Sequence, residues 1–243
     1  MTEIPNSCRV GDLDSYVGTS GWSYAWNEKR NIDWYVANSG LNAVELNASF
    51  YRFPFPTMIK SWAAKGEGLR WSIKVNRLIT HAFKFSDRAL QSWKKFQSLF
   101  TPLESSIDFF LFQLPPFTTP KSAPLIEKFF EKTRLDTRFA LEARNSEWFD
   151  EKWVKWASGL GMTWVSVDSP DFSLDVFNTS GSVYERMHGR TEWYSHLYTD
   201  EELRKVADKI LSVHPRRAYV FFNNDHAMLV NSRKMLSILE EVK

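Results

Sequence analysis

Apolar and polar positions follow two recurring patterns along the chain. Short runs rich in β-branched and aromatic residues predict strands, and the segments between them repeat apolar residues every three or four positions, as helices do. In residues 87–100, for example, Leu90, Trp93 and Phe96 keep helical spacing behind the capping residue Ser86. Further helices are predicted over 123–132, 150–159 and 200–214, the last behind Thr199. The predicted strands are Ser15–Gly21, Ala43–Phe50, Arg70–Arg77, Phe109–Leu114, Arg138–Arg144, Thr163–Asp168, Ser182–His188 and Arg217–Asn224.

This alternation predicts a closed barrel. Successive strand–helix–strand units give parallel strands with right-handed crossovers, and eight of them fit 243 residues as a single (β/α)8 TIM-type barrel of the α/β class. The alternative, an open doubly wound sheet, usually has a glycine-rich phosphate turn after its first strand. The first strand here ends in Gly18-Thr19-Ser20-Gly21-Trp22, which lacks that glycine spacing. We therefore expect one domain over residues 1–243, with 1–14 as an irregular N-terminal segment.

Polar and ionisable residues gather in the carboxyl-terminal halves of the predicted strands, whereas the amino-terminal halves are mostly apolar. In a parallel barrel all carboxyl ends open onto one face, where the active sites of such barrels are built. A barrel with a purely structural interior would be filled with Val, Ile and Leu, so the set predicts a functional pocket. Its members are Glu45, Asn47, Lys74, Gln113, Glu142, Arg144, Asp168, Arg186, His188, Asn223 and Asn224.

Composition narrows the class of protein. The chain has 31 Lys and Arg against 29 Asp and Glu, a balance that argues against non-specific coating of nucleic acid. Cys8 is the one cysteine, so neither an intramolecular disulfide nor a cysteine-based zinc cluster is expected. The N-terminus lacks the apolar stretch of a signal peptide, and no apolar run approaches the roughly 20 residues of a membrane helix. We expect a soluble, cytoplasmic protein without a membrane partner.

Three carboxylates and a histidine are the candidate catalytic residues. Glu45, Glu142 and Asp168 come from three strands and are expected to converge with His188 on the barrel axis. In one interpretation they hold Mg²⁺ or Mn²⁺ together with His188 or His81. In the other, no metal is present and one carboxylate with a raised pKa is the general acid or base. The cofactor therefore stays undetermined, with a divalent metal as one candidate.

Lys74, Arg144 and Arg186 form the cationic side of the expected pocket. Three basic groups at a barrel mouth suggest a small anionic substrate, most simply a phosphate or carboxylate held by arginine. The alternative is an internal salt-bridge network with Glu45 and Glu142. Lys74 also suits a Schiff base, as in barrel aldolases, although the sequence alone shows no desolvated lysine.

The remaining candidates are substrate-binding residues. His81 and the amides Asn47, Gln113, Asn223 and Asn224 would orient hydroxyl-rich or base-like ligands. Aromatic residues on the predicted loops of the same face would stack on a sugar or nucleobase, or pack the loops onto the barrel rim. These aromatic candidates are Trp22, Tyr51, Tyr194 and Tyr198.

These strand-end motifs resemble the YecE-like family, a TIM-barrel family of unknown function. The resemblance spans nearly the whole chain and implies the barrel fold, but it supplies no reaction. Structural analogy of such barrels to endonuclease IV would imply a nucleic-acid substrate, yet a trinuclear zinc site needs more histidines than the 5 present. The chain departs from the family pattern over residues 225–231. The segments that carry the resemblance are 18–22 with Tyr24 and Trp26, 44–52, 72–77, 79–81, 111–116, 142–144 with Trp148, 167–168, 184–189, Tyr194, Tyr198 and 221–224.

Together these features predict an enzyme that acts on a small anionic, phosphorylated or sugar-containing substrate. Its reaction stays open among hydrolase, lyase and isomerase. A protein that binds or processes nucleic acid through the aromatic and basic rim is the alternative, and a non-catalytic ligand-binding barrel is a third. Neither the substrate nor the oligomeric state is predicted.

Overall fold

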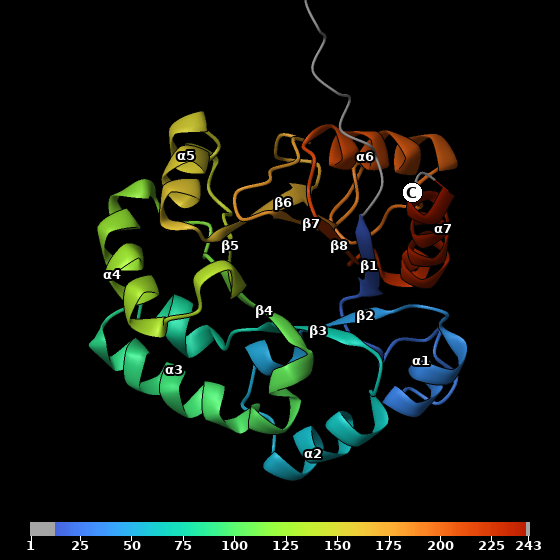
Figure 1. Cartoon of the computed structure of the whole chain (residues 1–243), viewed down its shortest axis with the longest axis horizontal. Helices are drawn as coiled ribbons and strands as arrows, with labels where there is room; N and C mark the ends of the chain where they lie inside the picture. The colour runs from blue at the N-terminus through green and yellow to red at the C-terminus, as the bar shows by residue number, and fades with distance from the viewer. Residues whose placement is uncertain (1–12, 242–243) are drawn as a thin grey trace, which may run out of the picture.

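The chain folds into a closed barrel of parallel strands that pair in sequence order, with β8 closing onto β1 (Figure 1). This computed structural model describes residues 13–241. The predicted (β/α)8 barrel is confirmed. The strands are β1 (Asp14–Thr19), β2 (Ala43–Leu46), β3 (Arg70–Lys74), β4 (Ile107–Gln113), β5 (Phe139–Glu142), β6 (Thr163–Asp168), β7 (Ser182–Met187) and β8 (Arg217–Phe222).

Helices surround the barrel on its outer side (Figure 1). The helices expected over 87–100, 123–132, 150–159 and 200–214 are confirmed, with ends that differ by two residues or fewer. The side chain of Thr199 forms a capping box with Glu202, whereas Ser86 caps its helix without a side-chain bond. The helices are α1 (Ile32–Asn38), α2 (Pro56–Lys65), α3 (Asp87–Leu99), α4 (Ala123–Thr133), α5 (Glu151–Leu160), α6 (Asp200–Ser212) and α7 (Met228–Glu241).

One connection lacks a helix. Residues 169–181, between β6 and β7, form an extended segment with turns. Thr179 and Phe177 bond this segment to β6, because Trp164 N donates to Thr179 Oγ1 at 2.8 Å and Phe177 N donates to Ser166 Oγ at 2.9 Å. The segment contains three Ser and two Asp together with Asn178, Pro170 and Gly181, which favour turns over a helix.

Several strands end before their predicted limits. Asn47 follows β2 and leads into a short 3₁₀ turn over 48–50, and β3 is followed by a π-helical turn over 78–82. Arg144 lies two residues beyond the end of β5. Polar side chains predicted on strands 43–50, 70–77 and 138–144 therefore lie partly on the loops at the barrel mouth.

Aromatic side chains form a layer inside the barrel, on the side away from the carboxyl ends of the strands. Phe109, Tyr184 and Tyr219 pack edge to face at 4.8–5.1 Å between ring centroids, and Tyr16 stacks on Tyr219 at 4.8 Å. Phe221 packs against the same cluster. A second, larger core fills the space between the strands and the helices. The polar residues lie nearer the carboxyl ends of the strands than this aromatic layer. One end of the barrel interior is therefore filled by packed aromatic side chains, and the other contains charged groups.

Within residues 13–241, no helix has both the length and the apolar composition that a membrane crossing requires.

Candidate active site

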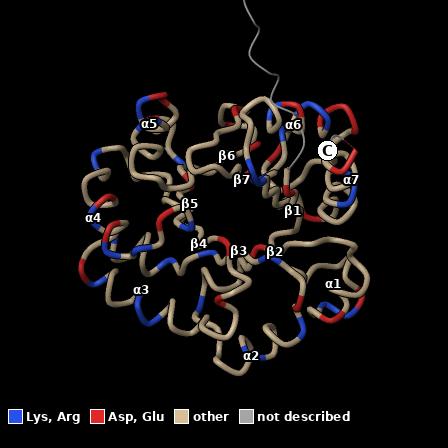
Figure 2. Tube along the Cα trace, in the orientation of Figure 1, with Lys and Arg blue, Asp and Glu red and all other residues tan. Residues whose placement is uncertain are grey.

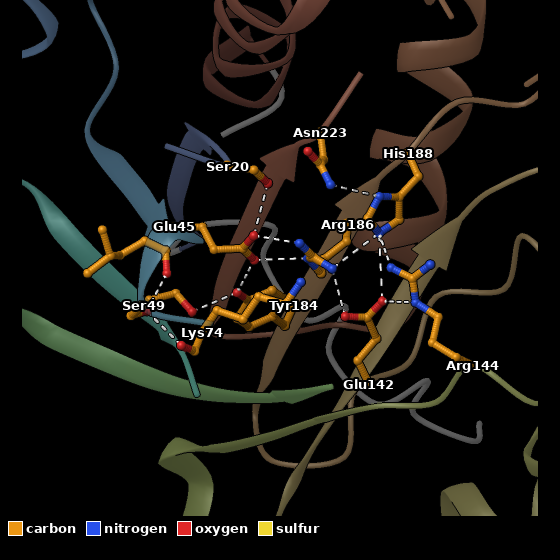
Figure 3. Close-up of polar contacts among 12 residues, drawn as sticks. Ser20, Glu45, Ser49, Lys74, Glu142, Arg144, Tyr184, Arg186, His188 and Asn223 are labelled. Atoms are coloured by element: carbon orange, nitrogen blue, oxygen red, sulfur yellow. Dashed lines mark hydrogen bonds and ion pairs between the residues drawn. The ribbon is translucent and has the colours of Figure 1, made fainter. Parts of the chain in front are cut away.

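Inward-facing positions bring a ring of polar side chains to the carboxyl ends of the strands. Side chains alternate in and out along a strand, so Glu45, Lys74, Gln113, Glu142 and Arg186 share the inward parity of the aromatic layer below them. Glu45 and Arg186 are fully buried. Figure 3 shows Glu45 and Glu142 extending toward Arg186 from different strands of the barrel.

Arg186 occupies the centre of this ring. Its Nη2 and Nε donate to the two oxygens of Glu45 at 2.6 and 2.9 Å, and its Nη1 donates to Glu142 Oε2 at 2.7 Å. Burial alone would lower the pKa of Arg186, but Glu142 and Glu45 outweigh it and raise the pKa. Arg186 therefore matches the alternative prediction of an internal salt-bridge network. Its donors are used by two carboxylates, so they are not available to a substrate anion.

Glu45 has all its acceptor positions in use. Besides Arg186, Ser20 Oγ donates to Oε1 at 2.9 Å and Tyr184 OH donates to Oε2 at 2.7 Å. Burial and the neighbouring Glu45 raise the pKa of Tyr184 well above its usual value, so the phenol keeps its proton and its donor role. Glu45 is held as a structural anion at the base of the mouth.

Glu142, Arg144 and His188 form the second half of the network. Arg144 Nε donates to Glu142 Oε1, and Arg144 Nη2 and Arg186 Nη1 lie 3.0 and 3.3 Å from His188 Nε2. Because both guanidiniums are donors, His188 Nε2 is an acceptor, and the other ring nitrogen, Nδ1, lies 3.2 Å from Asn223 Nδ2.

The neighbouring charges determine the protonation states of His188 and Glu142. Burial, then Arg186 and Arg144, lower the pKa of His188 well below its usual value, so the ring is neutral. For Glu142, burial raises the pKa, but Arg144 and Arg186 outweigh it and hold the pKa well below its usual value. A neutral imidazole with an occupied Nε2 and a fully paired carboxylate leave little capacity for proton transfer.

Lys74 differs from the charged groups of this network because its amine has no bonding partner in the described structure. It is 9% exposed, and its Nζ lies 4.5 Å from the centre of the Phe50 ring. Within residues 13–241 its amine makes no hydrogen bond or ion pair, and the bond to Lys74 drawn in Figure 3 runs from Ser49 Oγ to its backbone oxygen at 2.7 Å. Burial, followed by the nearby Arg186, lowers the pKa of Lys74 to about 7.

Asp168 does not join the other carboxylates. Val165 and Val167 take the inward positions of β6, so Asp168 has the outward parity and lies in a separate cluster. It accepts from Arg190 Nη2 at 2.7 Å and from Tyr198 OH at 2.9 Å. Tyr198 is itself buried and serves this cluster.

Of the other expected binding residues, some lie at the mouth of the barrel and others make structural contacts. At the mouth, Asn47 Oδ1 and Gln113 Oε1 are buried and have no hydrogen-bond partner in the described part of the chain. His81 is half-buried and packs edge-on against Phe50 at 5.2 Å, with its Nδ1 2.8 Å from Thr80 Oγ1. Tyr194 is 40% exposed and lies edge-on to His188.

Two expected binding residues have structural roles. Asn224 is buried, and its Nδ2 donates to His196 O at 2.6 Å and to Asn231 Oδ1 at 2.9 Å. Trp22 is buried in the outer core against Trp62 and Trp71. These contacts fix the loops after β8 and β1.

A cavity of about 670 Å³ adjoins the mouth beyond β1 and β2. Asn47 and Ser20 line it from the mouth, and the rings of Trp22, Tyr24 and Tyr51 form part of its wall. Tyr51 is 73% exposed, so its ring is open to a ligand. The volume is in the range of small-molecule sites.

The residues expected as metal ligands are not arranged as a metal site. Arg186 lies between Glu45 and Glu142, and Asp168 bonds Arg190 instead. Over residues 13–241, no three His, Cys, Asp or Glu side chains come together as a ligand set. Mg²⁺ and Mn²⁺ need several oxygen ligands, so these residues do not fit the metal interpretation.

The sequence reasoning missed three residues of the site. Ser20 and Tyr184 complete the bonding of Glu45, and their inward parity was the available signal. Arg190 pairs with Asp168 and lies on the loop after β7, whose path a strand pattern does not reveal. Trp193, an aromatic residue of the same loop, covers Arg144 with its ring centre 4.6 Å from the guanidinium carbon.

Comparison with solved structures agrees with the fold. A DUF72 family protein from Thermotoga maritima MSB8 is 25% identical, with a TM-score of 0.78 over 93% of this chain and 99% of that one. Another, from Enterococcus faecalis V583, is 19% identical, with a TM-score of 0.78 over 93% and 98% of the two chains. A methyltransferase from Methanosarcina mazei shares the fold more distantly, at 12% identity and a TM-score of 0.53 over 93% and 94% of the chains.

No curated protein matches the sequence. The family model described as "Protein of unknown function DUF72" matches residues 16–242, and YecE-like is a name of the same family. The resemblance seen in the strand-end motifs is thus confirmed, and the chain belongs to the DUF72 family.

Proposed function

We propose that this protein is an enzyme that binds a small anionic substrate at the carboxyl-terminal mouth of its barrel and uses Lys74 to move a proton. The observation that carries the proposal is the buried amine of Lys74, which has no partner in the part of the chain that the structure describes, while Glu45, Glu142 and Arg186 beside it are paired. The substrate class is a phosphorylated or carboxylate-bearing small molecule.

The charge balance of the mouth favours an anion. The carboxylates of Glu45 and Glu142 are matched by the guanidiniums of Arg186 and Arg144. Protonated Lys74 is therefore an unbalanced positive charge in a desolvated place, where electrostatic attraction is stronger than in water. An incoming anion compensates that charge, and the side chain of Arg144, which is 8% exposed, offers its Nη1 as a second donor.

Lys74 takes the acid–base role that the sequence assigns to Glu142, Glu45, Asp168 and His188. A pKa of about 7 makes both protonation states available near neutral pH, which suits a general acid or base. Glu45, Glu142 and His188 are positioning residues in this proposal, since they hold Arg186 and Arg144 in place. Asp168 lies outside the mouth.

The cavity beside β1 and β2 supplies space for the part of the substrate that does not react. Its aromatic side chains suit the face of a sugar or a base, and Asn47 lines it at the junction with the mouth. This accommodates a sugar-containing substrate with the anionic group near Lys74.

A panel of sugar phosphates, sugar acids and small carboxylates tests the proposal. We expect one class to raise the Tm of the protein and to be converted in an assay followed by proton NMR. Lys74→Met and Arg144→Met should each weaken binding at least about tenfold, whereas Lys155→Met, on the exposed face of α5, should not. Binding that is unaffected by Lys74→Met would overturn the anion site, and tight retention without conversion would identify a binding protein instead.

Single-stranded DNA at low salt is the matching test for the nucleic-acid alternative. Figure 2 shows Lys and Arg interspersed with Asp and Glu around the ring of helices, without a continuous basic stripe in that view. We expect no binding that falls steeply with salt, the behaviour that phosphate contacts produce.

A further inference from the structure

The oxygens nearest the centre of the mouth are already committed to other donors. Glu45 Oε1 accepts from Ser20 and Arg186, and its Oε2 accepts from Tyr184 and Arg186. Glu142 gives one oxygen to Arg186 and the other to Arg144. Lys74 points into this ring, and in the described structure no carboxylate pairs with its amine.

Burial and the positive charge of the nearby Arg186 favour the free amine of Lys74. The Phe50 ring against its Nζ acts in the opposite direction, because an aromatic face attracts the ammonium form. Desolvation and a neighbouring cation are the two environments that produce unprotonated, nucleophilic lysines in proteins. Lys74 is also the last residue of β3, a rigid element, so its amine is held in place at the mouth.

We propose that the Lys74 amine is a nucleophile that forms an imine with the carbonyl carbon of a small aldehyde or ketone carrying a carboxylate or phosphate. This deepens the proposed function and rests on its anion site. The anionic group of the substrate would pair with Arg144, two residues beyond the end of β5, and its carbonyl would face the Lys74 amine at the end of β3.

The chemistry is balanced without an oxidant or reductant. The nitrogen lone pair of Lys74 forms a bond to the carbonyl carbon, the carbonyl oxygen takes up a proton, and the nitrogen loses one. The carbon–oxygen bond of this adduct then breaks, and the oxygen leaves as water with one further proton. The product is a protonated imine, and addition of water reverses both steps.

His81 is positioned to serve the departing oxygen. It packs edge-on against the same Phe50 ring on which Lys74 rests, and it is half-buried rather than closed off. Burial, Lys74 and Arg77 lower the pKa of His81, so its ring is mostly neutral at pH 7 and orients the oxygen by hydrogen bonding. The proton that leaves with the water is supplied by solvent. Its use of Nδ1 toward Thr80 leaves Nε2 for the substrate.

Reductive trapping tests the imine directly. The native protein is incubated at pH 7 with pyruvate, or with glyceraldehyde 3-phosphate, and sodium cyanoborohydride, and the modified lysines are located by peptide mass spectrometry. We expect Lys74 to be modified at least about tenfold faster than the exposed Lys155, because a lysine of ordinary pKa is almost wholly protonated at pH 7. Modification of Lys74 no faster than that of Lys155 with both carbonyl compounds overturns the proposal.

Two variants separate this outcome from failure of the proposed function. Lys74→Arg keeps the charge but forms no imine, so we expect it to bind inorganic phosphate or pyruvate and to lose trapping at position 74. Arg144→Met should weaken binding and slow the trapping of Lys74. If wild-type protein binds these anions through Lys74 and Arg144 but Lys74 is not trapped, the imine is wrong and the anion site stands. If no anion binds, the proposed function fails.

Discussion

Arg186 connects the two sides of the barrel through a single side chain. Its guanidinium bonds Glu45 on β2 and Glu142 on β5, and all three groups are fully buried. Three charges taken out of water remain stable only when each is paired, since loss of one partner leaves a buried charge without compensation. The network therefore holds Arg144 and His188 in place. The free energy of desolvating its three charges must be offset by other interactions in the fold.

Replacing Arg186 by Met should lower the free energy of unfolding by about 3–5 kcal/mol, because two buried carboxylates lose their common partner. Arg186→Lys should recover little, since one ammonium does not reproduce donors on three nitrogens. Urea denaturation measures both. The control is Arg204→Met, which removes a half-exposed ion pair with Glu241 and should change stability by no more than roughly 1 kcal/mol. An Arg186→Met protein as stable as wild type would contradict the network.

Glu185 provides a second test at the scale of one residue. It is buried on the outward face of β7, and its Oε2 has no partner in the described structure. Burial, and then Asp168, raise its pKa well above 4.5, so the folded state keeps a proton that the unfolded chain loses above pH 4.5. Its stabilising contribution is complete below pH 4.5 and is lost as pH rises toward the folded pKa.

Glu185→Gln should therefore raise the Tm at pH 7 and leave it almost unchanged near pH 4. A gain of 1 kcal/mol corresponds to about 2–4 °C for a chain of this size. Thermal unfolding followed by circular dichroism at both pH values measures it, with the exposed Glu151→Gln as the control. Equal shifts at the two pH values would mean that Glu185 is ionised in the folded protein.

Single residues also show where sequence reasoning succeeds. The inward positions of Glu45, Lys74 and Glu142 follow from strand parity, so these residues could be placed in the mouth. The same parity, applied to Val165 and Val167, would have excluded Asp168. Whether Arg186 binds substrate or carboxylates depends on which side chains lie opposite it across the barrel, which a linear pattern does not contain.

At the scale of elements, the strands were identified from their apolar runs, but their ends were not. The predicted strands over 43–50 and 70–77 continue through residues that instead form a 3₁₀ turn and a π-helical turn. Sequence periodicity averages over several residues and does not mark where hydrogen bonding to the next strand stops. The connection over 169–181, which has no helix, differs from these strand ends, because its content of turn-forming residues can be read directly from the sequence.

The contact between β1 and β2 depends on a glycine. A Cβ at Gly18 would lie 2.2 Å from the backbone oxygen of Ala43, so Gly18→Ala should force the strands apart and cost about 1–3 kcal/mol. Gly159 in α5 is the matched control, because its Cβ would meet nothing within 4 Å. Gly159→Ala should stabilise the protein by roughly 0.5–1 kcal/mol. Urea denaturation that gives both variants the same sign would contradict this account of the strand contact.

For the whole molecule, the alternation of strands and helices was sufficient to predict the closed barrel, because parallel strands with right-handed crossovers admit few arrangements. The same geometry places the groups of the proposed site. Aromatic side chains around Tyr184 and Tyr219 fill one end of the barrel interior, and the charged side chains of the carboxyl ends lie next to them.

Lys74 tests whether a buried amine among the charged side chains lowers the stability of the fold. Its pKa falls from 10.5 in the unfolded chain to about 7 in the folded protein, so between these pH values the unfolded chain binds more protons. Stability should rise with pH over this window, and the full cost of burying the amine is present below pH 7. Lys74→Met should therefore stabilise the protein most at pH 7 and below, and the gain should shrink toward pH 10. Urea denaturation at pH 6, 8 and 10, compared with Lys155→Met, measures it. A gain that does not vary with pH would show that Lys74 is stabilised as a cation, and both the proton-transfer role and the imine would then lose their basis.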